Sequence, residues 1–285
     1  MKLLITGASG FLGRRAATYF SEQGYTVLTP GHKELDITWP EAVLAFCLQH
    51  RPDAVLHCAA VSDTGACQRE PDRTALINVN GSVNLAKACA NIGARFVFCS
   101  SDQVYVGSSL PGPHREDEPL TPHTAYACQK KQAEELCQND CPDTVILRLS
   151  WMYSTVSFPG EHGHFLSTLQ TAIHNISAPI SWPIHDRRGI TDVDAVVNHL
   201  PAALRLPAGT YNFGAANDRD TYHTIEHVMR RLGREDLLCR LEANTTAFSD
   251  APRDIRMNTE KLQDFGIRFD SSADGLLLAL SNSLV

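Results

Sequence analysis

Short apolar runs alternate with amphipathic segments along the first half of the chain. The runs that predict strands are Lys2–Thr6, Tyr25–Thr29, Ala54–Cys58, Arg95–Ser100 and Thr144–Arg148. The segments whose apolar positions recur at helical spacing are Phe11–Glu22, Pro40–His50, Asn80–Ile92 and Tyr126–Cys137. Continuous apolar strands separated by helices indicate βαβ units, in which helices cover both faces of a parallel sheet. The predicted fold class is therefore α/β, with a doubly wound parallel sheet.

The regular alternation ends near residue 150. Residues 154–163 read as a loop, and helices are expected at about 164–175, 192–205, 221–232 and 258–265. We therefore expect a first domain over residues 1–150. Residues 151–285 are expected to form mostly a smaller, irregular α/β domain.

Composition narrows the class of protein. The formal net charge of −7 argues against a main role in holding nucleic acid or an anionic membrane surface. No apolar run approaches the roughly 20 residues of a spanning helix. Gly7 and Gly10 interrupt the apolar start too early for a signal peptide. Nine cysteines, an odd number with no Cys-x-x-Cys spacing, favour a reducing environment and hence a cytoplasmic location.

A glycine-rich loop, Gly7-Ala8-Ser9-Gly10-Phe11-Leu12-Gly13, joins the first strand to the first helix. Gly7 permits the tight turn, Gly10 lets the backbone approach a pyrophosphate, and Gly13 lets helix and strand pack closely. The pyrophosphate would sit at the helix N-terminus, on free N–H groups and the positive end of the dipole. The loop predicts a Rossmann-type dinucleotide-binding domain. The expected contacts are Gly7, Ser9, Gly10, Phe11, Leu12 and Gly13; the alternative is a tight turn that holds no ligand.

The end of the second strand indicates which cofactor is used. It runs into Pro30-Gly31-His32-Lys33 and carries no acid for a ribose 2′-hydroxyl, while Arg14 follows the third glycine. We therefore favour NADP (NADPH) over NAD, with Arg14, His32 and Lys33 as candidates for the 2′-phosphate. The alternative is that these are solvated surface charges. Asp36, in Leu35-Asp36-Ile37, either accepts a hydrogen bond from the adenine amino group or caps the following helix.

A tyrosine and a lysine lie at positions i and i+4 of a predicted helix, in Tyr126-Ala127-Cys128-Gln129-Lys130. A nearby ammonium is expected to lower the pKa of the tyrosine from about 10, so that Tyr126 can exchange a proton with a carbonyl or hydroxyl group. The strand that ends in Ser100-Ser101 places hydroxyl groups at the carboxyl edge of the sheet, where ligands bind.

In combination, the glycine loop, the Ser-Ser strand end and the Tyr-x-x-x-Lys helix resemble the extended short-chain dehydrogenase/reductase family over essentially the whole chain. The resemblance implies that Tyr126 is the acid/base, that Lys130 binds the nicotinamide ribose, and that Ser101 orients the substrate oxygen. It implies that Asn78 supports a proton relay, and that part of residues 180–210 returns to the cofactor domain. Further implied cofactor contacts are Ile37, Ala59, Ala60, Ser100, Tyr126 and Lys130.

Within this family the segments most resemble the dTDP-4-dehydrorhamnose reductases. The resemblance rests on Glu34–Thr38, Arg51–Asp53, Leu147–Tyr153, Gly209–Asn212 and Met257–Leu262. It implies hydride transfer to C4 of a nucleotide-linked 4-keto-6-deoxy sugar, with Tyr126 as proton donor. The expected substrate contacts are Ser62, Asp102, Gln103, Trp151, His164, Arg188 and Arg253. The sequence departs from this pattern at Val61–Ala66, at His164 and before Pro252, so the identity of the sugar stays open. Whether the protein forms a homodimer also stays open.

Other functions are weighed against this one. Dehydratases of the family carry an Asp-Glu pair where this chain has Asp102-Gln103, and an amide cannot transfer a proton as a carboxylic acid does. A non-catalytic NADP-binding regulator, resembling the β-subunit of methionine adenosyltransferase, and a nucleotide-sugar epimerase stay open. His223-Thr224-Ile225-Glu226-His227 matches an inverted zinc-protease string, but it lies in the second domain, so we expect a helix surface and no metal.

Overall fold

The computed structural model describes residues 1–159, 161 and 163–283, and the chain divides into two compact units. Unit 1 comprises Met1–Val104, Leu120–Arg148 and Val197–Tyr211. Unit 2 comprises Tyr105–Pro119, Leu149–Val196 and Asn212–Val285. Residues 105–119, which the sequence analysis assigns to the first domain, therefore cluster with the second unit, and residues 197–211 cluster with the first.

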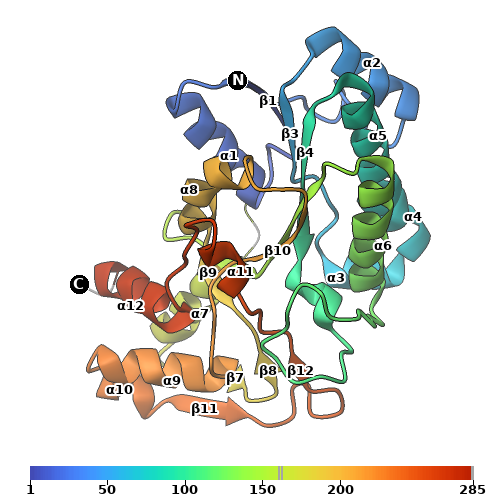
Figure 1. Ribbon diagram of the computed structural model, residues 1–285. Coiled ribbons are helices and arrows are strands. Elements are labelled where there is room, and N and C mark those ends of the chain that lie inside the picture. The colour runs from blue at the N-terminus through green and yellow to red at the C-terminus, as the bar shows by residue number, and fades with distance from the viewer. Residues whose placement is uncertain (160, 162, 284–285) are drawn as a thin grey trace. The chain divides into compact units, whose positions relative to one another are not determined.

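The strands are short, and most of them alternate with helices along the chain (Figure 1). They are β1 (Lys2–Thr6), β2 (Thr26–Leu28), β3 (Ala54–His57), β4 (Arg95–Ser101), β5 (Val145–Leu149), β6 (Trp151–Tyr153), β7 (Ile180–Pro183), β8 (Asp186–Arg187), β9 (Ile190–Asp192), β10 (Gly209–Phe213), β11 (Leu241–Asn244) and β12 (Arg253–Asp254).

The α-helices are α1 (Phe11–Glu22), α2 (Pro40–His50), α3 (Thr64–Arg69), α4 (Pro71–Ala75), α5 (Ser82–Ile92), α6 (Ala125–Asp140), α7 (Phe165–His174), α8 (Val193–Ala203), α9 (Thr221–Arg231), α10 (Glu235–Leu238), α11 (Glu260–Gln263) and α12 (Ser272–Ser283). A π-helical turn, η1 (Leu76–Gly81), precedes α5, and a 3₁₀ turn, η2 (Asp102–Tyr105), follows β4. No helix in the described ranges is long and apolar enough to cross a lipid bilayer.

Unit 1 is built around a six-stranded sheet with the order β10-β5-β4-β3-β1-β2. β1 pairs in parallel with β2 on one side and with β3 on the other, and β3 pairs in parallel with β4. The chain thus reverses its direction of travel across the sheet between β1 and β3. In doubly wound sheets, ligands bind beyond the carboxyl ends of the strands at such a switch point. The predicted α/β class with a Rossmann-type parallel sheet is confirmed.

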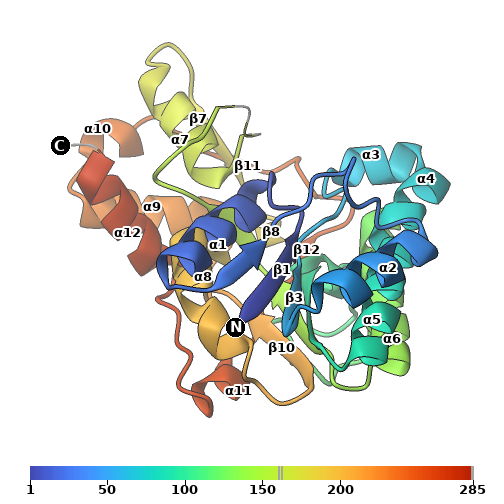
Figure 2. The same cartoon turned by 90° about the horizontal axis from the view of Figure 1, so that it is seen from above.

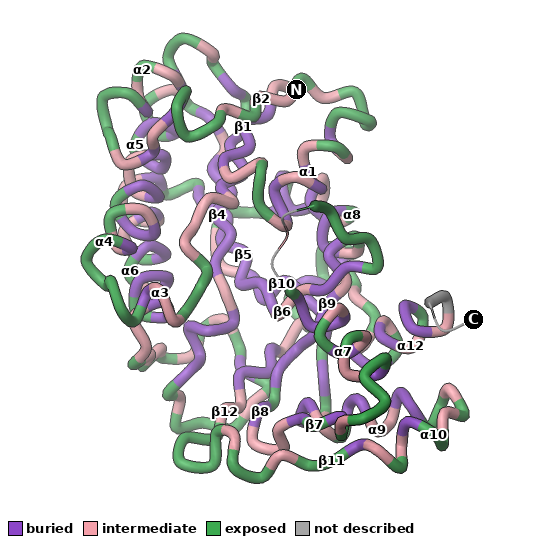
Figure 3. Tube along the Cα trace, turned by 180° about the vertical axis from the view of Figure 1, so that it is seen from behind, coloured by how far each residue is buried: buried purple, intermediate pink, exposed green. Residues whose placement is uncertain are grey.

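Helices cover both faces of this sheet, with α2, α5 and α6 on one face and α1 on the other (Figures 1 and 2). The first face buries a cluster that includes Leu4, Val55, Leu85, Phe96 and Ile146. The central strands β1, β3, β4 and β5 are accordingly almost wholly buried (Figure 3). Strands buried on both faces read as continuous apolar runs, which is why the sequence predicts them.

In the described part of unit 2, β11 pairs in parallel with β7, β12 with β8, and β6 with β9. Its core gathers apolar side chains mainly from α7, α9, α12 and these strands, among them Phe165, Trp182, Ile225 and Leu276. The sequence analysis predicts the helices α7, α8, α9 and α11 but none of the strands β6 to β9, β11 and β12. These strands have two to four residues, too few for alternation to be visible.

Candidate active site

A cavity of about 660 Å³ in unit 1 lies beyond the carboxyl ends of β1, β2 and β3. The cofactor contacts expected from the sequence that line it are Gly7, Ser9, Gly10, Arg14, His32, Asp36, Ile37, Ala59 and Ala60. Lining residues that the sequence analysis does not single out as contacts include Thr6, Thr29, Thr38, Cys58 and Val61. The location of the cavity is the switch point of the sheet, where the fold is expected to hold a ligand.

The glycine loop brings backbone very close to backbone. Gly7 has φ +69°, and a Cβ added there would lie 2.6 Å from the backbone nitrogen of Ala59. A Cβ on Gly13 would lie 2.2 Å from the carbonyl oxygen of Gly7. The N-cap of α1 is Gly10, so no side chain caps the first N–H groups of this helix. A helix N-terminus of this kind, with the positive end of the helix dipole, is where anions bind in such folds.

Two cationic candidates line the cavity, and one does not. Arg14 Nη2 donates a hydrogen bond to the Ser9 carbonyl oxygen (3.4 Å), and His32 Nε2 lies 3.8 Å from Asp36 Oδ2. Lys33 is exposed and is not among the lining residues. Asp36 Oδ1 accepts hydrogen bonds from the Thr38 backbone and hydroxyl (2.9 and 2.7 Å). The hydrogen bond from the Thr38 hydroxyl, and to a smaller extent that from the Thr38 backbone, lowers the pKa of the Asp36 carboxyl. The carboxylate therefore remains a strong hydrogen-bond acceptor.

Tyr126 lies in the first turn of α6 and is 8% exposed, and its hydroxyl has an interaction with Ser101 at the end of β4. Burial raises the pKa of Tyr126 above its ordinary value, the charge of Asp102 adds to the rise, and the hydrogen bond with Ser101 opposes it. The expected lowering by Lys130 is therefore wrong for this structure, because desolvation of the phenolate dominates. The tyrosine is protonated at neutral pH.

Lys130 is almost fully buried, and its Nζ donates a hydrogen bond to the Cys99 carbonyl oxygen (2.8 Å). The ammonium lies 4.7 Å from the centroid of the Phe98 ring and 5.9 Å from that of Tyr126. Burial lowers the pKa of Lys130, and neighbouring groups including Glu134 oppose this fall. The strand β4 therefore holds the ammonium beside the tyrosine.

Asn78 lies within the π-helical turn η1, and its side chain forms hydrogen bonds with two other segments of unit 1. Its Oδ1 accepts a hydrogen bond from the Val61 N–H (2.8 Å), and its Nδ2 donates to the Val61 carbonyl oxygen (3.0 Å). The same Nδ2 donates to Gln129 Oε1 (2.8 Å) on α6. Asn78 thus joins Val61, which lines the cavity, to the helix that carries Tyr126 and Lys130.

Several expected cofactor contacts lie outside the cavity lining, namely Phe11, Leu12, Gly13, Lys33, Ser100, Tyr126 and Lys130. The Ser100 hydroxyl donates a hydrogen bond to the buried carboxylate of Glu134 and faces α6. Leu12 is 5% exposed and packs in the interior. Lys130 is linked to the cavity through Cys99: its Nζ donates to the Cys99 carbonyl oxygen, and the Cys99 sulfur lies 3.7 Å from the sulfur of Cys58, which lines the cavity.

A buried histidine, His57, stands at the end of β3. Thr6 Oγ1 lies 2.7 Å from its Nδ1, and Ser82 Oγ lies 2.9 Å from its Nε2. Burial, and secondarily the charge of Lys130, lowers the pKa of His57 to about 3. His57 is therefore neutral in the folded protein at the pH of a cell.

This shift predicts acid sensitivity. Because the folded pKa is depressed, the unfolded chain binds more protons between about pH 3 and 6.5, so stability falls as pH falls below 6.5. The loss is at most about 1.4 kcal/mol per pH unit, or about 2 kcal/mol between pH 6.5 and 5. Urea unfolding across this range should show a smaller slope for His57→Gln than for the parent protein. Equal slopes, with the exposed His32→Gln as control, would contradict the prediction.

The expected substrate contacts of unit 1 lie at two loops. Ser62 is exposed, just before the N-cap of α3, Asp63. Asp102 and Gln103 are buried in η2. The Gln103 N–H donates a hydrogen bond to Ser101 Oγ (3.2 Å), and Ser101 Oγ donates to Asp102 Oδ1 (3.2 Å). This turn therefore fixes the hydroxyl group of Ser101.

The expected substrate contacts of unit 2 already have protein partners. The Arg188 guanidinium lies 4.9 Å from the centroid of the Trp151 ring, and Arg253 forms an ion pair with Asp186 (2.9 Å). His164 caps α7: its Nδ1 accepts a hydrogen bond from the Ser167 N–H (3.3 Å). His162, two positions before His164, lies outside the described residues.

The zinc-like string is a helix surface. His223, Glu226 and His227 lie on α9, where His223 pairs with Asp220 (2.7 Å) and Glu226 with Arg230 (2.8 Å). Among residues 1–159, 161 and 163–283, no group of three or more His, Cys, Asp or Glu side chains is arranged to hold a metal ion.

The sequence analysis misses two buried polar residues on α6, Gln129 and Glu134. Gln129 connects Asn78 to α4 through hydrogen bonds to Pro71 and Thr74. Glu134 contacts Ser100 and Arg148. The spacing Tyr126, Lys130, Glu134 in steps of four residues is a signal that could have pointed to the latter.

The parallel sheet, the glycine loop at its switch point and the Tyr-Lys pair on α6 define an extended short-chain dehydrogenase/reductase. A family model described as the RmlD substrate binding domain matches residues 1–278. The chain belongs to this family.

Its relatives include sugar-nucleotide enzymes. The chain is 38% identical over 151 residues to a dTDP-4-dehydrorhamnose reductase of Streptomyces griseus, covering 53% of this chain and 49% of the relative. The chain thus spans about half the length of the curated reductases it matches. It is 36% identical over 242 residues to the spore coat polysaccharide biosynthesis protein SpsK of Bacillus subtilis (strain 168), covering 82% of this chain and 80% of the relative.

A solved structure has the same fold. The dTDP-4-dehydrorhamnose reductase of Bacillus anthracis, in complex with NADP, is similar with a TM-score of 0.82 over 99% of both chains. The two sequences are 22% identical, so the likeness concerns the fold.

Proposed function

We propose that the protein is an NADPH-dependent reductase of a nucleotide-linked 4-keto-6-deoxy sugar. The observation that carries the proposal is the placement of Tyr126, Ser101 and Lys130 around the end of β4, beside a cavity lined by the glycine loop. The dTDP-4-dehydrorhamnose reductases among the relatives support the substrate class. A cytoplasmic location remains part of the proposal, on the ground of the odd number of cysteines without Cys-x-x-Cys spacing, whereas a homodimer stays open.

The cavity fits a dinucleotide. Its volume of about 660 Å³ lies within the range of cofactor sites, and the Gly7 position has no room for a side chain. The uncapped first turn of α1 would hold the pyrophosphate, and Arg14 and His32 would hold the 2′-phosphate. The Bacillus anthracis relative was solved with NADP, which supports this choice of cofactor. When bound, NADPH supplies the hydride.

The chain's own residues would then manage the proton. Reduction of a ketone places negative charge on its oxygen, which needs a proton donor. Tyr126 suits this role because burial keeps its pKa high and its hydroxyl protonated. Ser101, whose oxygen is held by the Gln103 N–H, would turn its hydroxyl hydrogen from Asp102 to the same substrate oxygen. Lys130, held by Cys99, would bind the ribose and stabilise the phenolate that remains.

Elimination chemistry is disfavoured at this site. The side chain after Asp102 is Gln103, which is 8% exposed and has no acidic proton to transfer. A reductase needs one proton donor, whereas a dehydratase needs a further acid/base pair. In unit 2 the stacked pair Trp151 and Arg188, together with Arg253, would contact the nucleotide part of the substrate.

The experiment is direct. NADPH is supplied with a panel of nucleotide-linked 4-keto-6-deoxy sugars, beginning with the dTDP-linked one, and nicotinamide absorbance is followed. Oxidation that depends on the sugar supports the reductase. No oxidation with any member of the panel contradicts it. Tight NADPH binding without turnover would indicate the regulatory protein, and interconversion of sugars without net oxidation would indicate the epimerase.

Cofactor preference gives a separate prediction. Arg14→Ala/His32→Ala should raise the Kd for NADPH by about 10–100-fold, because hydrogen bonds to a charged group contribute about 1.5–3 kcal/mol. The Kd for NADH should change little, since NADH lacks the 2′-phosphate. Isothermal titration calorimetry with both cofactors measures this. Arg73→Ala, an exposed cation on α4, is the control for loss of charge. Equal losses for both cofactors would remove the two residues from the phosphate site.

A further inference from the structure

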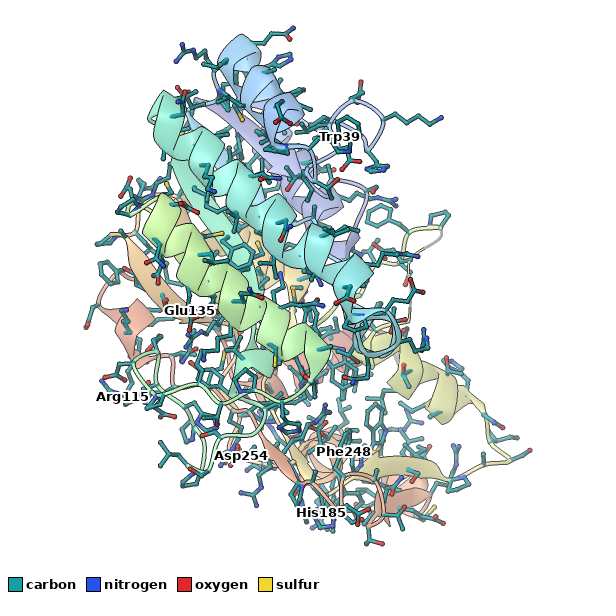
Figure 4. All side chains as sticks on the ribbon, turned by 90° about the vertical axis from the view of Figure 1, so that its right-hand side faces the viewer. Trp39, Arg115, Glu135, His185, Phe248 and Asp254 are labelled. Carbon is teal, nitrogen blue, oxygen red and sulfur yellow. The ribbon has the colours of Figure 1, made fainter. Side chains whose placement is uncertain are left out.

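A buried carboxylate lies on the catalytic face of α6 and has no role in the mechanism above. Glu134 follows Lys130 by one helical turn, as Lys130 follows Tyr126, so the three share one side of the helix. Glu134 is 4% exposed, whereas its neighbour Glu135, labelled in Figure 4, is exposed and pairs with Lys131. A buried carboxylate is costly unless hydrogen bonds and an opposite charge satisfy it.

The contacts of Glu134 satisfy it fully and connect three elements. Arg148 on β5, itself 4% exposed, donates from Nη2 to Glu134 Oε2 (2.7 Å) and from Nε to Oε1 (3.1 Å). The Ser100 hydroxyl on β4 donates to Glu134 Oε1. The carboxylate therefore joins α6 to both β4 and β5.

Three consecutive residues at the end of β4 face this side of α6. The Cys99 carbonyl oxygen accepts from Lys130, the Ser100 hydroxyl donates to Glu134, and Ser101 interacts with Tyr126. A shift of α6 along β4 would break all three contacts together. A second charged side chain, Arg148, pairs with Glu134 and holds it in place.

Glu134 also acts on Lys130 through its charge. Lys130 is buried, which favours its neutral form and lowers its pKa. The negative charge of Glu134 is among the groups that oppose this fall. Without it, more of Lys130 would be neutral near physiological pH.

We propose that Glu134 is a positioning residue: its carboxylate, one helical turn from Lys130, holds α6 against β4 and β5, so that Tyr126 and Ser101 meet the same substrate oxygen. The kinetic part of this inference rests on the proposed reductase function. The effect on Lys130 is a property of unit 1 and is measured without any substrate.

The first test is a titration of Lys130 by NMR. The chain has six lysines, so a protein with labelled lysine side chains gives a simple spectrum, and the Lys130 signal is assigned by its loss in Lys130→Met. Glu134→Gln should lower the pKa of Lys130 by about one unit, the lower end of the effect of a nearby opposite charge. Glu135→Gln, the exposed neighbour, should leave it unchanged. An unchanged titration in a folded Glu134→Gln protein overturns the proposal.

A second variant keeps the proposal testable if the Glu134→Gln protein does not fold. Glu134→Gln leaves Arg148 buried without its carboxylate, which destabilises proteins strongly. If thermal unfolding shows no folded Glu134→Gln protein, Glu134→Gln/Arg148→Met removes both charges and leaves none unpaired. The double variant should still lower the pKa of Lys130, but by less than Glu134→Gln, because the loss of the Arg148 cation acts in the opposite sense. A folded double variant with the parent Lys130 titration overturns the proposal.

Kinetics give the functional readout. With a reducible sugar nucleotide, the alkaline fall of kcat should begin about one pH unit lower in Glu134→Gln, because Lys130 loses its proton earlier. The KM for NADPH should stay within about twofold. A merely structural role would lower kcat equally at every pH, and that outcome contradicts the proposal. If the parent protein reduces no sugar nucleotide, the proposed function fails, and the Lys130 titration alone decides the role of Glu134.

Discussion

Tyr126→Phe is expected to lower kcat for sugar reduction by about 10²–10⁴-fold, the usual contribution of one general acid. The substitution removes a single oxygen from a ring that is 8% exposed, so the packing of α6 is kept. The Kd for NADPH should remain close to that of the parent protein, because the glycine loop and its cavity are unchanged. Steady-state kinetics and calorimetric titration of NADPH measure the two quantities.

Tyr153→Phe is the matched control. Tyr153 is fully buried in unit 2, and its hydroxyl has no hydrogen-bond partner among the described residues. The effect of Tyr153→Phe on kcat therefore measures what the loss of a buried tyrosine hydroxyl does when that hydroxyl takes no part in the proposed proton transfer. Equal kcat values for the parent and Tyr126→Phe proteins would refute Tyr126 as donor. A parallel fall in Tyr153→Phe would show that the loss reflects packing.

Much of unit 1 was predictable, for a physical reason. Strands buried on both faces are continuously apolar, and helices on the sheet carry an apolar stripe, so both patterns are visible in one sequence. Phe11–Glu22 and Pro40–His50 agree with the observed bounds. The helix expected at Asn80–Ile92 begins earlier, as the π-helical turn Leu76–Gly81. That turn contains Asn78, and functional residues often lie in such turns.

Other features depend on contacts that no local pattern records. The helices Thr64–Arg69 and Pro71–Ala75 have six and five residues, too few for a helical period. The glycine loop and the Tyr-Lys spacing are local patterns that the sequence alone reveals. The hydrogen-bond partner of Ser100 is not a local feature. Its hydroxyl serves Glu134, which lies 34 positions away on α6. The pKa of Tyr126 was also misjudged, because burial in the fold outweighs the charge of a lysine one turn away.

The glycine loop carries the second large expected effect. Gly7→Ala should raise the Kd for NADPH by at least about 100-fold, equivalent to about 2.7 kcal/mol. The added Cβ would lie 2.6 and 2.7 Å from Ala59 N and Cα and 2.9 Å from the Cys58 carbonyl carbon. All three are backbone atoms, so the segment after β3 must move. Because Cys58 and Ala59 line the cavity, that movement deforms the floor on which the cofactor would lie.

Gly24→Ala separates this clash from backbone strain. Gly24 has φ +79°, close to the φ of +69° at Gly7, but a Cβ there would meet nothing within 4 Å. Its substitution should cost about 1–2 kcal/mol of stability, the penalty of a left-handed conformation, and leave NADPH binding unchanged. Gly7→Ala should carry that penalty together with an overpacking cost of about 1–3 kcal/mol. Urea unfolding and NADPH titration of both variants measure the two effects. If both variants bind NADPH like the parent protein, the close approach of Gly7 to Ala59 does not shape the cofactor site, and the cavity would have to receive the pyrophosphate elsewhere.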